Sequence, residues 1–142
     1  MSTSIETILL YTIGAGFLSI VYGFFTGKNI LNSSAGNAKM QDIASAIQIG
    51  AKAYLARQYK TIALVGVVVL IIVSVAFSPM VGLGYLIGAA LSGIAGYVGM
   101  LVSVEANVRT AEASRKGLAQ GLSVAFKSGA VTGMLVSGFA LL

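Results

Sequence analysis

Residues 61–104 read TIALVGVVVLIIVSVAFSPMVGLGYLIGAALSGIAGYVGMLVSV, without one charged side chain. A hydrocarbon core about 30 Å thick is crossed by about 20 apolar residues of helix, so this stretch is long enough for two spans. Ser78 and Pro79 lie between two apolar runs, and proline is tolerated in the first turn of a helix but not in its interior. The stretch therefore predicts a hairpin of two membrane helices, at about 62–77 and 81–104, with Pro79 opening the second.

The rest of the chain predicts two further spans. The uncharged run that ends at Lys28 predicts a span over about 8–27. The last uncharged run follows Lys127 and is short, so we expect the final helix to begin near 123, with the Lys127 ammonium reaching the interface, and to span about 123–142. The predicted fold class is all-α: a polytopic helical membrane protein with about four transmembrane helices in a single domain, residues 1–142.

The composition agrees with a membrane protein and excludes several kinds of chemistry. Of the residues, 57% are hydrophobic and 9% charged, against about 25% charged in an average soluble domain. Cysteine and histidine are absent from the sequence, which excludes disulfides, thiolate chemistry and His-based metal sites. The glycines do not form a phosphate-binding P-loop motif. No predicted span carries the carboxylate that a rotary-ATPase proteolipid needs near the middle of the membrane.

The cations predict the orientation of the chain. Eight of the nine Lys and Arg residues lie in two segments between the spans, which we expect to form cytoplasmic loops over 28–60 and 105–122. The ninth, Lys127, lies near the start of the last span and reaches the same side. The N-terminus is then outside, and the net charge of +5 reflects membrane topology instead of nucleic-acid binding. In a bacterial cell this predicts a multi-pass protein integral to the inner membrane, with the lipid bilayer as a partner. A cleaved signal peptide is the alternative for the first span, but the acidic tail and long apolar run disfavour it.

The first loop carries a helical pattern of its own. Met40, Ile43, Ile47, Ala51 and Tyr54 recur at spacings of three and four residues, opposite a polar face. This pattern predicts an amphipathic helix that continues into the second span. Its apolar face could lie in the membrane interface or pack on a cytoplasmic domain.

Small residues recur at helical spacing in the spans. The longest stripe, at i, i+4 spacing, consists of Gly84, Gly88, Ser92 and Gly96. Shorter patterns are Gly23/Gly27 and Gly129/Gly133/Ser137. Small residues let helix backbones approach closely in lipid. We therefore expect the third helix to be packed on at least one long face by another helix, from this chain or from further sequence.

The end of the third span and the segment after it carry a resemblance to a known family. The chain reads Gly99-Met100, Ala106-Asn107-Val108-Arg109-Thr110-Ala111, Arg115-Lys116-Gly117, Ala125-Phe126 and Ser128-Gly129-Ala130-Val131. Together with IQxGA at 47–51 and YLxRQY at 54–59, this pattern resembles the N-terminal portion of the membrane-bound pyrophosphatases, which are pyrophosphate-energised proton or sodium pumps.

The resemblance implies that the chain is the N-terminal segment of a larger pump, with helices like those of the outer ring of a larger bundle. The missing polar flank after the last span also favours a longer parent protein. The resemblance further implies that the parent is a homodimer, that its substrate is pyrophosphate and that its remaining helices are partners of this segment. Mg²⁺ would be bound outside this segment. The alternative is a non-catalytic four-helix membrane subunit of a larger complex. Whether the chain alone is an enzyme stays open.

Catalytic, cofactor-binding and metal-binding residues are not expected in this segment. Its four carboxylates are scattered, whereas a diphosphate with several Mg²⁺ ions needs a cluster of them. We instead expect structural support at the cytoplasmic end of the third helix from Glu105, Asn107, Arg109 and Glu112. Ion pairs Glu105–Arg109 and Arg109–Glu112 would contribute about 0.2 to 0.5 kcal/mol each. A second hypothesis is that Arg109 reaches an inner-ring helix and holds the catalytic region in place.

Overall fold

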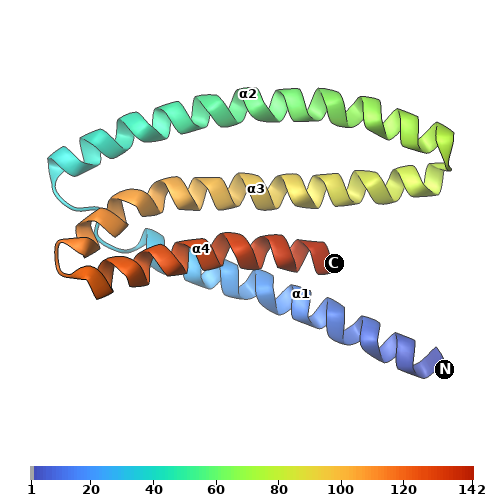
Figure 1. Cartoon of the computed structure of the whole chain (residues 1–142), viewed down its shortest axis with the longest axis horizontal. Helices are drawn as coiled ribbons and strands as arrows, with labels where there is room; N and C mark the ends of the chain where they lie inside the picture. The colour runs from blue at the N-terminus through green and yellow to red at the C-terminus, as the bar shows by residue number, and fades with distance from the viewer. Residues whose placement is uncertain (1) are drawn as a thin grey trace.

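A computed structural model of the chain describes residues 2–142, and Met1, the first residue of the predicted domain, lies outside them. The described part consists of four helices without strands: α1 (Ser2–Leu31), α2 (Ala38–Ala76), α3 (Pro79–Ser114) and α4 (Leu118–Leu141) (Figure 1). Each helix is long and apolar enough to cross a membrane. The predicted all-α fold with four membrane helices is confirmed.

The break between α2 and α3 lies where the sequence predicts it. Ser78 is the N-cap of α3, and its side-chain oxygen accepts a hydrogen bond from the backbone N–H of Val81 at 3.3 Å. Pro79 occupies the first turn, where its missing N–H costs nothing because that group has no intrahelical partner. The expectation that Pro79 opens the third helix is confirmed.

The helices run well past the predicted spans. The amphipathic segment and the second span form one helix, α2, as expected, and α3 continues to Ser114. The predicted loops are therefore mostly helix, and the irregular connections shrink to residues 32–37, 77–78 and 115–117. The physical reason is that a helix satisfies its own backbone hydrogen bonds and does not need to stop at the membrane boundary. Where the hydrocarbon begins and ends along each helix stays a prediction from the charges.

The helices lie side by side in the order α2, α3, α4, α1 (Figure 1). Within residues 2–142, α1 and α2 do not pack on each other although they are consecutive in the chain. The core lies where α1, α3 and α4 meet, and Val131 of α4 is its most enclosed side chain, 1% exposed. The other buried members of this core are Ile30, Ala95, Val102, Ala106 and Leu135.

Glycine gives the closest approach between two helices. A Cβ atom added to Gly138 of α4 would lie 2.8 Å from the carbonyl oxygen of Gly16 in α1, and one added to Gly16 would lie 2.9 Å from the oxygen of Gly138. Any other residue at either position would push the two backbones apart. The helices α1 and α4 therefore cross at a reciprocal pair of glycines.

The predicted glycine patterns have mixed outcomes. Gly23 packs against Leu135, as a packing glycine should. A Cβ atom added to Gly129 or Gly133, in contrast, would have no other part of residues 2–142 within 4 Å. These two glycines therefore do not pack against another helix of this chain. Spacing alone does not show which side of a helix meets a neighbour.

The longest stripe, on α3, lies mostly outside the packed faces. Gly84, Gly88 and Ser92 have little or nothing packed against them, and Gly96 meets only the hydroxyl of Tyr59, 3.0 Å from an added Cβ. The face of α3 that packs on α4 is instead the neighbouring one, which contains Ala95, Gly99, Val102 and Ala106. One long face of α3 is thus packed by another helix, and the stripe itself remains open within the described residues.

The apolar face predicted for the start of α2 is also displaced. Ile43, Ile47 and Tyr54 are exposed, whereas Ala44 and Leu55 are buried. The two faces differ by one residue, or about 100° around the helix. Ala44 and Leu55 lie on the side of α2 that packs on α3, since α3 is the helix that α2 contacts.

Candidate functional site

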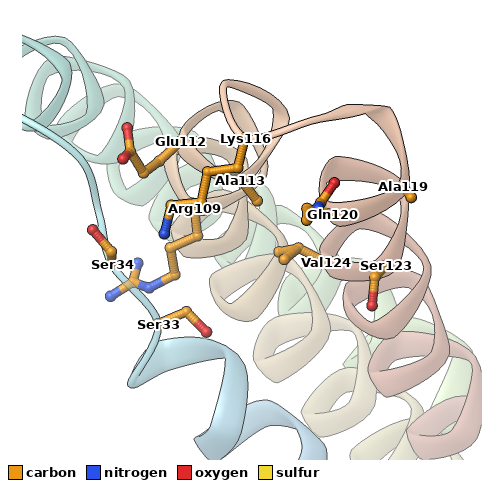
Figure 2. A pocket seen from close by; sticks show the side chains of 10 residues that line it. All are labelled: Ser33, Ser34, Arg109, Glu112, Ala113, Lys116, Ala119, Gln120, Ser123 and Val124. Atoms are coloured by element: carbon orange, nitrogen blue, oxygen red, sulfur yellow. The ribbon is translucent and has the colours of Figure 1, made fainter.

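Polar side chains gather at one end of the bundle, where four parts of the chain meet. These parts are the C-terminal end of α1, the connection 32–37, the last turns of α3 and the first turns of α4 (Figure 2). Most of the cations of the sequence lie toward this end, which we call the cationic end of the bundle. The structure therefore places three of the predicted support residues of α3, Glu105, Arg109 and Glu112, at this meeting point.

Arg109 is the centre of this arrangement. Its Nε and Nη2 donate to the carbonyl oxygen of Leu31 at 3.2 and 2.9 Å, and its Nη1 donates to the backbone oxygen and the carboxylate of Glu105 at 2.6 and 3.0 Å. The side chain of Arg109 is only 12% exposed. The last carbonyls of a helix lack intrahelical partners and favour a nearby cation. Arg109 therefore closes the C-terminus of α1 and joins it to α3.

The predicted ion pairs have different outcomes. The Glu105–Arg109 pair is confirmed, with a separation of 3.0 Å. The Arg109–Glu112 pair is wrong, because Glu112 binds Arg115 at 3.0 Å while the guanidinium of Arg109 is turned toward Leu31 and Glu105. Asn107 is exposed, about 200° around α3 from Glu105, so it does not join the other three predicted residues.

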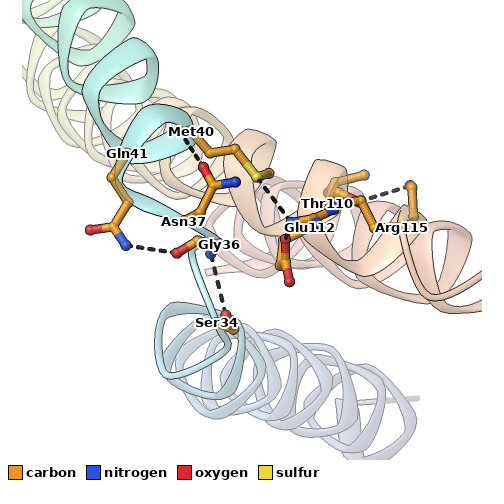
Figure 3. A network of polar contacts seen from close by, with 9 residues as sticks. Ser34, Gly36, Asn37, Met40, Gln41, Thr110, Glu112 and Arg115 are labelled. Atoms are coloured by element: carbon orange, nitrogen blue, oxygen red, sulfur yellow. Dashed lines mark hydrogen bonds and ion pairs between the residues drawn. The ribbon is translucent and has the colours of Figure 1, made fainter.

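The connection between α1 and α2 is held against the end of α3 (Figure 3). Asn37 caps α2 by accepting a hydrogen bond from the N–H of Met40 at 3.0 Å, and Gln41 donates to the oxygen of Gly36 at 2.8 Å. Gly36 has a φ of +80°, a conformation that favours glycine, and an added Cβ would lie 3.1 Å from Glu112. The sulfur of Met40 accepts from Arg115 at 3.9 Å. Together these contacts fix the connection.

A cavity of about 490 Å³ opens among these elements (Figure 2). It is lined by Ser33, Ser34, Arg109, Glu112, Ala113, Lys116, Ala119, Gln120, Ser123 and Val124. Two cationic side chains and several hydroxyl and amide groups therefore face one space. A second cavity, of about 380 Å³, lies between α3 and α4 beside the stripe glycines Gly84 and Gly88 and is lined almost entirely by apolar side chains.

One interhelical contact lies away from the cationic end. The hydroxyl of Tyr59 in α2 donates to the backbone oxygen of Gly93 in α3 at 2.8 Å, and its ring meets that of Tyr97 edge to face, with centroids 5.4 Å apart. The sequence does not predict this contact, because a backbone acceptor in the middle of a helix leaves no pattern in the side chains.

The part of the chain that the structure describes holds no group of three or more His, Cys, Asp or Glu residues placed to bind a metal ion. The geometry of the cationic end is that of a support: Arg109 ties α3 to α1, and Arg115 at the end of α3 contacts Met40 at the start of α2. Two ion pairs within the C-terminal part of α3 hold these arginines in place.

Comparison with known proteins identifies relatives over most of the chain. The family model of inorganic H⁺ pyrophosphatase matches residues 17–142. A K⁺-insensitive pyrophosphate-energized proton pump of Methanosarcina mazei is 45% identical over 130 residues, which cover 90% of this chain and 19% of the pump. A putative K⁺-stimulated pyrophosphate-energized sodium pump of Clostridium tetani is 39% identical over 129 residues, covering 91% of this chain and 19% of that protein. The chain spans about a fifth of the length of these relatives.

Proposed function

Because the chain belongs to the inorganic H⁺ pyrophosphatase family, we propose that it is the N-terminal segment of a pump that couples pyrophosphate hydrolysis to proton or sodium translocation across a membrane. The observation that carries the proposal is the match over residues 17–142, supported by relatives named as pyrophosphate-energized pumps. Four helices long enough to cross a membrane fit such a protein. Relatives of both ion types are similar to this chain, so the proposal covers both ions.

Within the parent protein, which we define as the full-length pump, this segment acts as a scaffold. The hydrolytic site, with its pyrophosphate and Mg²⁺, belongs to the remaining helices, and the parent forms a homodimer. The scaffold role is supported by the bonds from Arg109 to Leu31 and Glu105. The ion pair of Glu112 with Arg115 supports it as well. Side chains committed to such contacts hold helix ends in place.

The cationic end faces the cytoplasm and the N-terminus lies outside. The support for this orientation is the concentration of Lys and Arg beside the predicted spans, which the positive-inside rule assigns to the cytoplasmic side. The hydrolytic site of the parent would then lie on the cytoplasmic side of the membrane, the same side as the cationic end.

Ion uptake into inverted membrane vesicles tests the proposed function. Vesicles from cells that express the parent should take up protons or sodium ions when pyrophosphate and Mg²⁺ are added, and an ionophore for the transported ion should abolish the gradient. A pH-sensitive dye and a sodium tracer measure the two ions separately, with and without K⁺. The proposal fails if the protein is present in the vesicles and pyrophosphate drives neither uptake. A stable native product of only 142 residues would favour the four-helix subunit instead.

A further inference from the structure

The cavity at the cationic end contains hydrogen-bond donors that the fold leaves unused. The side chains of Lys116, Gln120 and Ser123 make no hydrogen bond or ion pair with any other part of residues 2–142. Ser34 accepts a hydrogen bond from the N–H of Gly36 at 3.2 Å, so its hydroxyl hydrogen is still available to donate. Four side chains from three parts of the chain therefore present ammonium, amide and hydroxyl donors to one space of about 490 Å³ (Figure 2).

The charge of the cavity is positive because of Lys116. Arg109 is balanced by Glu105, and Glu112, the one acidic side chain that lines the cavity, is balanced by Arg115, in ion pairs of 3.0 Å each. Lys116 has no such partner among the described residues. An anion with several acceptor oxygens meets these requirements, and a phosphate group is the common biological example.

The predicted spans place the floor of the cavity, which we define as the part lined by Ser33, Arg109 and Ser123, at the depth of lipid headgroups. Arg109 follows the predicted end of the third span, residue 104, by about 7 Å of helix. Ser123 lies about one helical turn from Lys127, toward the start of α4, and Ser33 follows the α1 cation Lys28 by five residues. Headgroups occupy about 5 to 8 Å on each side of the hydrocarbon. A lipid phosphate can therefore reach the floor from the bilayer while Lys116 approaches it from the aqueous side.

We propose that this cavity binds a phosphate group through Lys116, Ser34, Gln120 and Ser123. The same chemistry is offered by the headgroup of an anionic phospholipid and by free phosphate. The depth of the floor favours the lipid, because basic pockets between membrane helices on the cytoplasmic side are suited to anionic headgroups. The first turn of α4, which contributes Ala119 and Gln120 to the lining, is capped by Gly117 without any side-chain bond and leaves backbone N–H groups open as additional donors.

Lipid retention by the purified parent protein tests the site. Native mass spectrometry compares phosphatidylglycerol with phosphatidylcholine on the wild type, on Lys116→Gln and on the matched control Lys52→Gln, which removes an exposed cation of α2 outside the cavity. We expect the wild type to prefer phosphatidylglycerol and Lys116→Gln to weaken that binding about fivefold, since one cation near the surface contributes about 1 kcal/mol. The control should match the wild type.

A second measurement identifies the source of the phosphate. Equilibrium dialysis of labelled inorganic phosphate with the same variants should show no loss in Lys116→Gln if the ligand is a lipid. A loss in dialysis without a change in lipid retention would assign the cavity to free phosphate. Equal behaviour of Lys116→Gln and Lys52→Gln in both measurements would overturn the proposal. Lys116→Arg keeps the charge, so it should bind phosphatidylglycerol like the wild type. Such binding would show that the loss in Lys116→Gln comes from the missing charge and not from misfolding.

Discussion

At the scale of single residues, Arg109 is the side chain on which the cationic end depends. It is 12% exposed and donates to Leu31 through two nitrogens and to Glu105 through the third. A lysine cannot reproduce this pattern, because its ammonium is a point charge without the planar fork of the guanidinium. The guanidinium is thus engaged within this segment. This favours the interpretation that Arg109 holds α1 in place, and it disfavours the hypothesis that Arg109 directly contacts the catalytic region.

Arg109→Gln should therefore destabilise the protein. We expect a loss of about 1.5 to 3 kcal/mol, because a hydrogen-bonded charged group is removed and the carbonyl of Leu31 is left without a donor. Unfolding of the purified parent in SDS, followed by circular dichroism, measures the change. Arg57→Gln removes an exposed cation of α2 and should leave the unfolding curve unchanged. Identical curves for both variants would contradict the assigned role of Arg109.

The residues of this cluster show what sequence can and cannot predict. Glu105 and Arg109 are four residues apart on one helix, so their pairing follows from helix geometry alone. The bond from Arg109 to Leu31 joins residues far apart in the chain, and its acceptor is a backbone oxygen that every residue has. The same contact draws the guanidinium away from Glu112, which is why the second predicted pair does not form.

At the scale of helices, the break between α2 and α3 was more predictable than the packed faces or the outer ends of the helices. Ser78 and Pro79 carry local signals for a helix start, so the hairpin of α2 and α3 could be located from sequence. Which face of α2 packs on α3 depends on the neighbour, and Ala44 and Leu55 are buried there instead of Ile43 and Ile47. In a membrane protein, exposed apolar side chains are compatible with lipid, so hydrophobicity alone does not mark the packed face.

The crossing of α1 and α4 gives a prediction at this scale. Gly138→Val should push α1 away from α4, because even a Cβ atom would lie 2.8 Å from the oxygen of Gly16. Overpacking of this kind costs about 1 to 3 kcal/mol. The measurement is again unfolding in SDS. The matched control is Gly133→Val, a change on the same helix where an added Cβ meets nothing within 4 Å. Equal losses would show that valine in α4, and not the crossing, causes the effect.

At the scale of the whole molecule, this chain has an open surface that the parent protein is expected to cover. The stripe residues Gly84, Gly88 and Ser92 run along an open face of α3 and border the apolar cavity of about 380 Å³. The segment matches only about a fifth of its relatives' length, so a parent of that length would have many further residues to pack there. We propose that the remaining helices of the parent contact this stripe.

Gly88→Leu should consequently impair assembly of the parent without disturbing the four helices described here, since nothing lies within 4 Å of an added Cβ. We expect the variant to lose its native elution volume in size-exclusion chromatography in detergent. Gly50→Leu replaces another open glycine, on the exposed start of α2, and should assemble normally. Normal elution of Gly88→Leu would remove the stripe as an assembly surface.

The absence of packing between α1 and α2 within residues 2–142 has a consequence for biosynthesis. The main partner of α1 is α4, and the Gly16–Gly138 crossing joins parts of the chain that leave the ribosome about 120 residues apart. At about 5 to 20 residues per second, α1 waits on the order of 10 s for that partner. Until α4 is made, the contacts of α1 within this segment are limited to α3, which it meets at Arg109 and Leu31, and its apolar central run can remain in contact with lipid. Of the four helices described, α1 is thus made first and gains its main packing partner last.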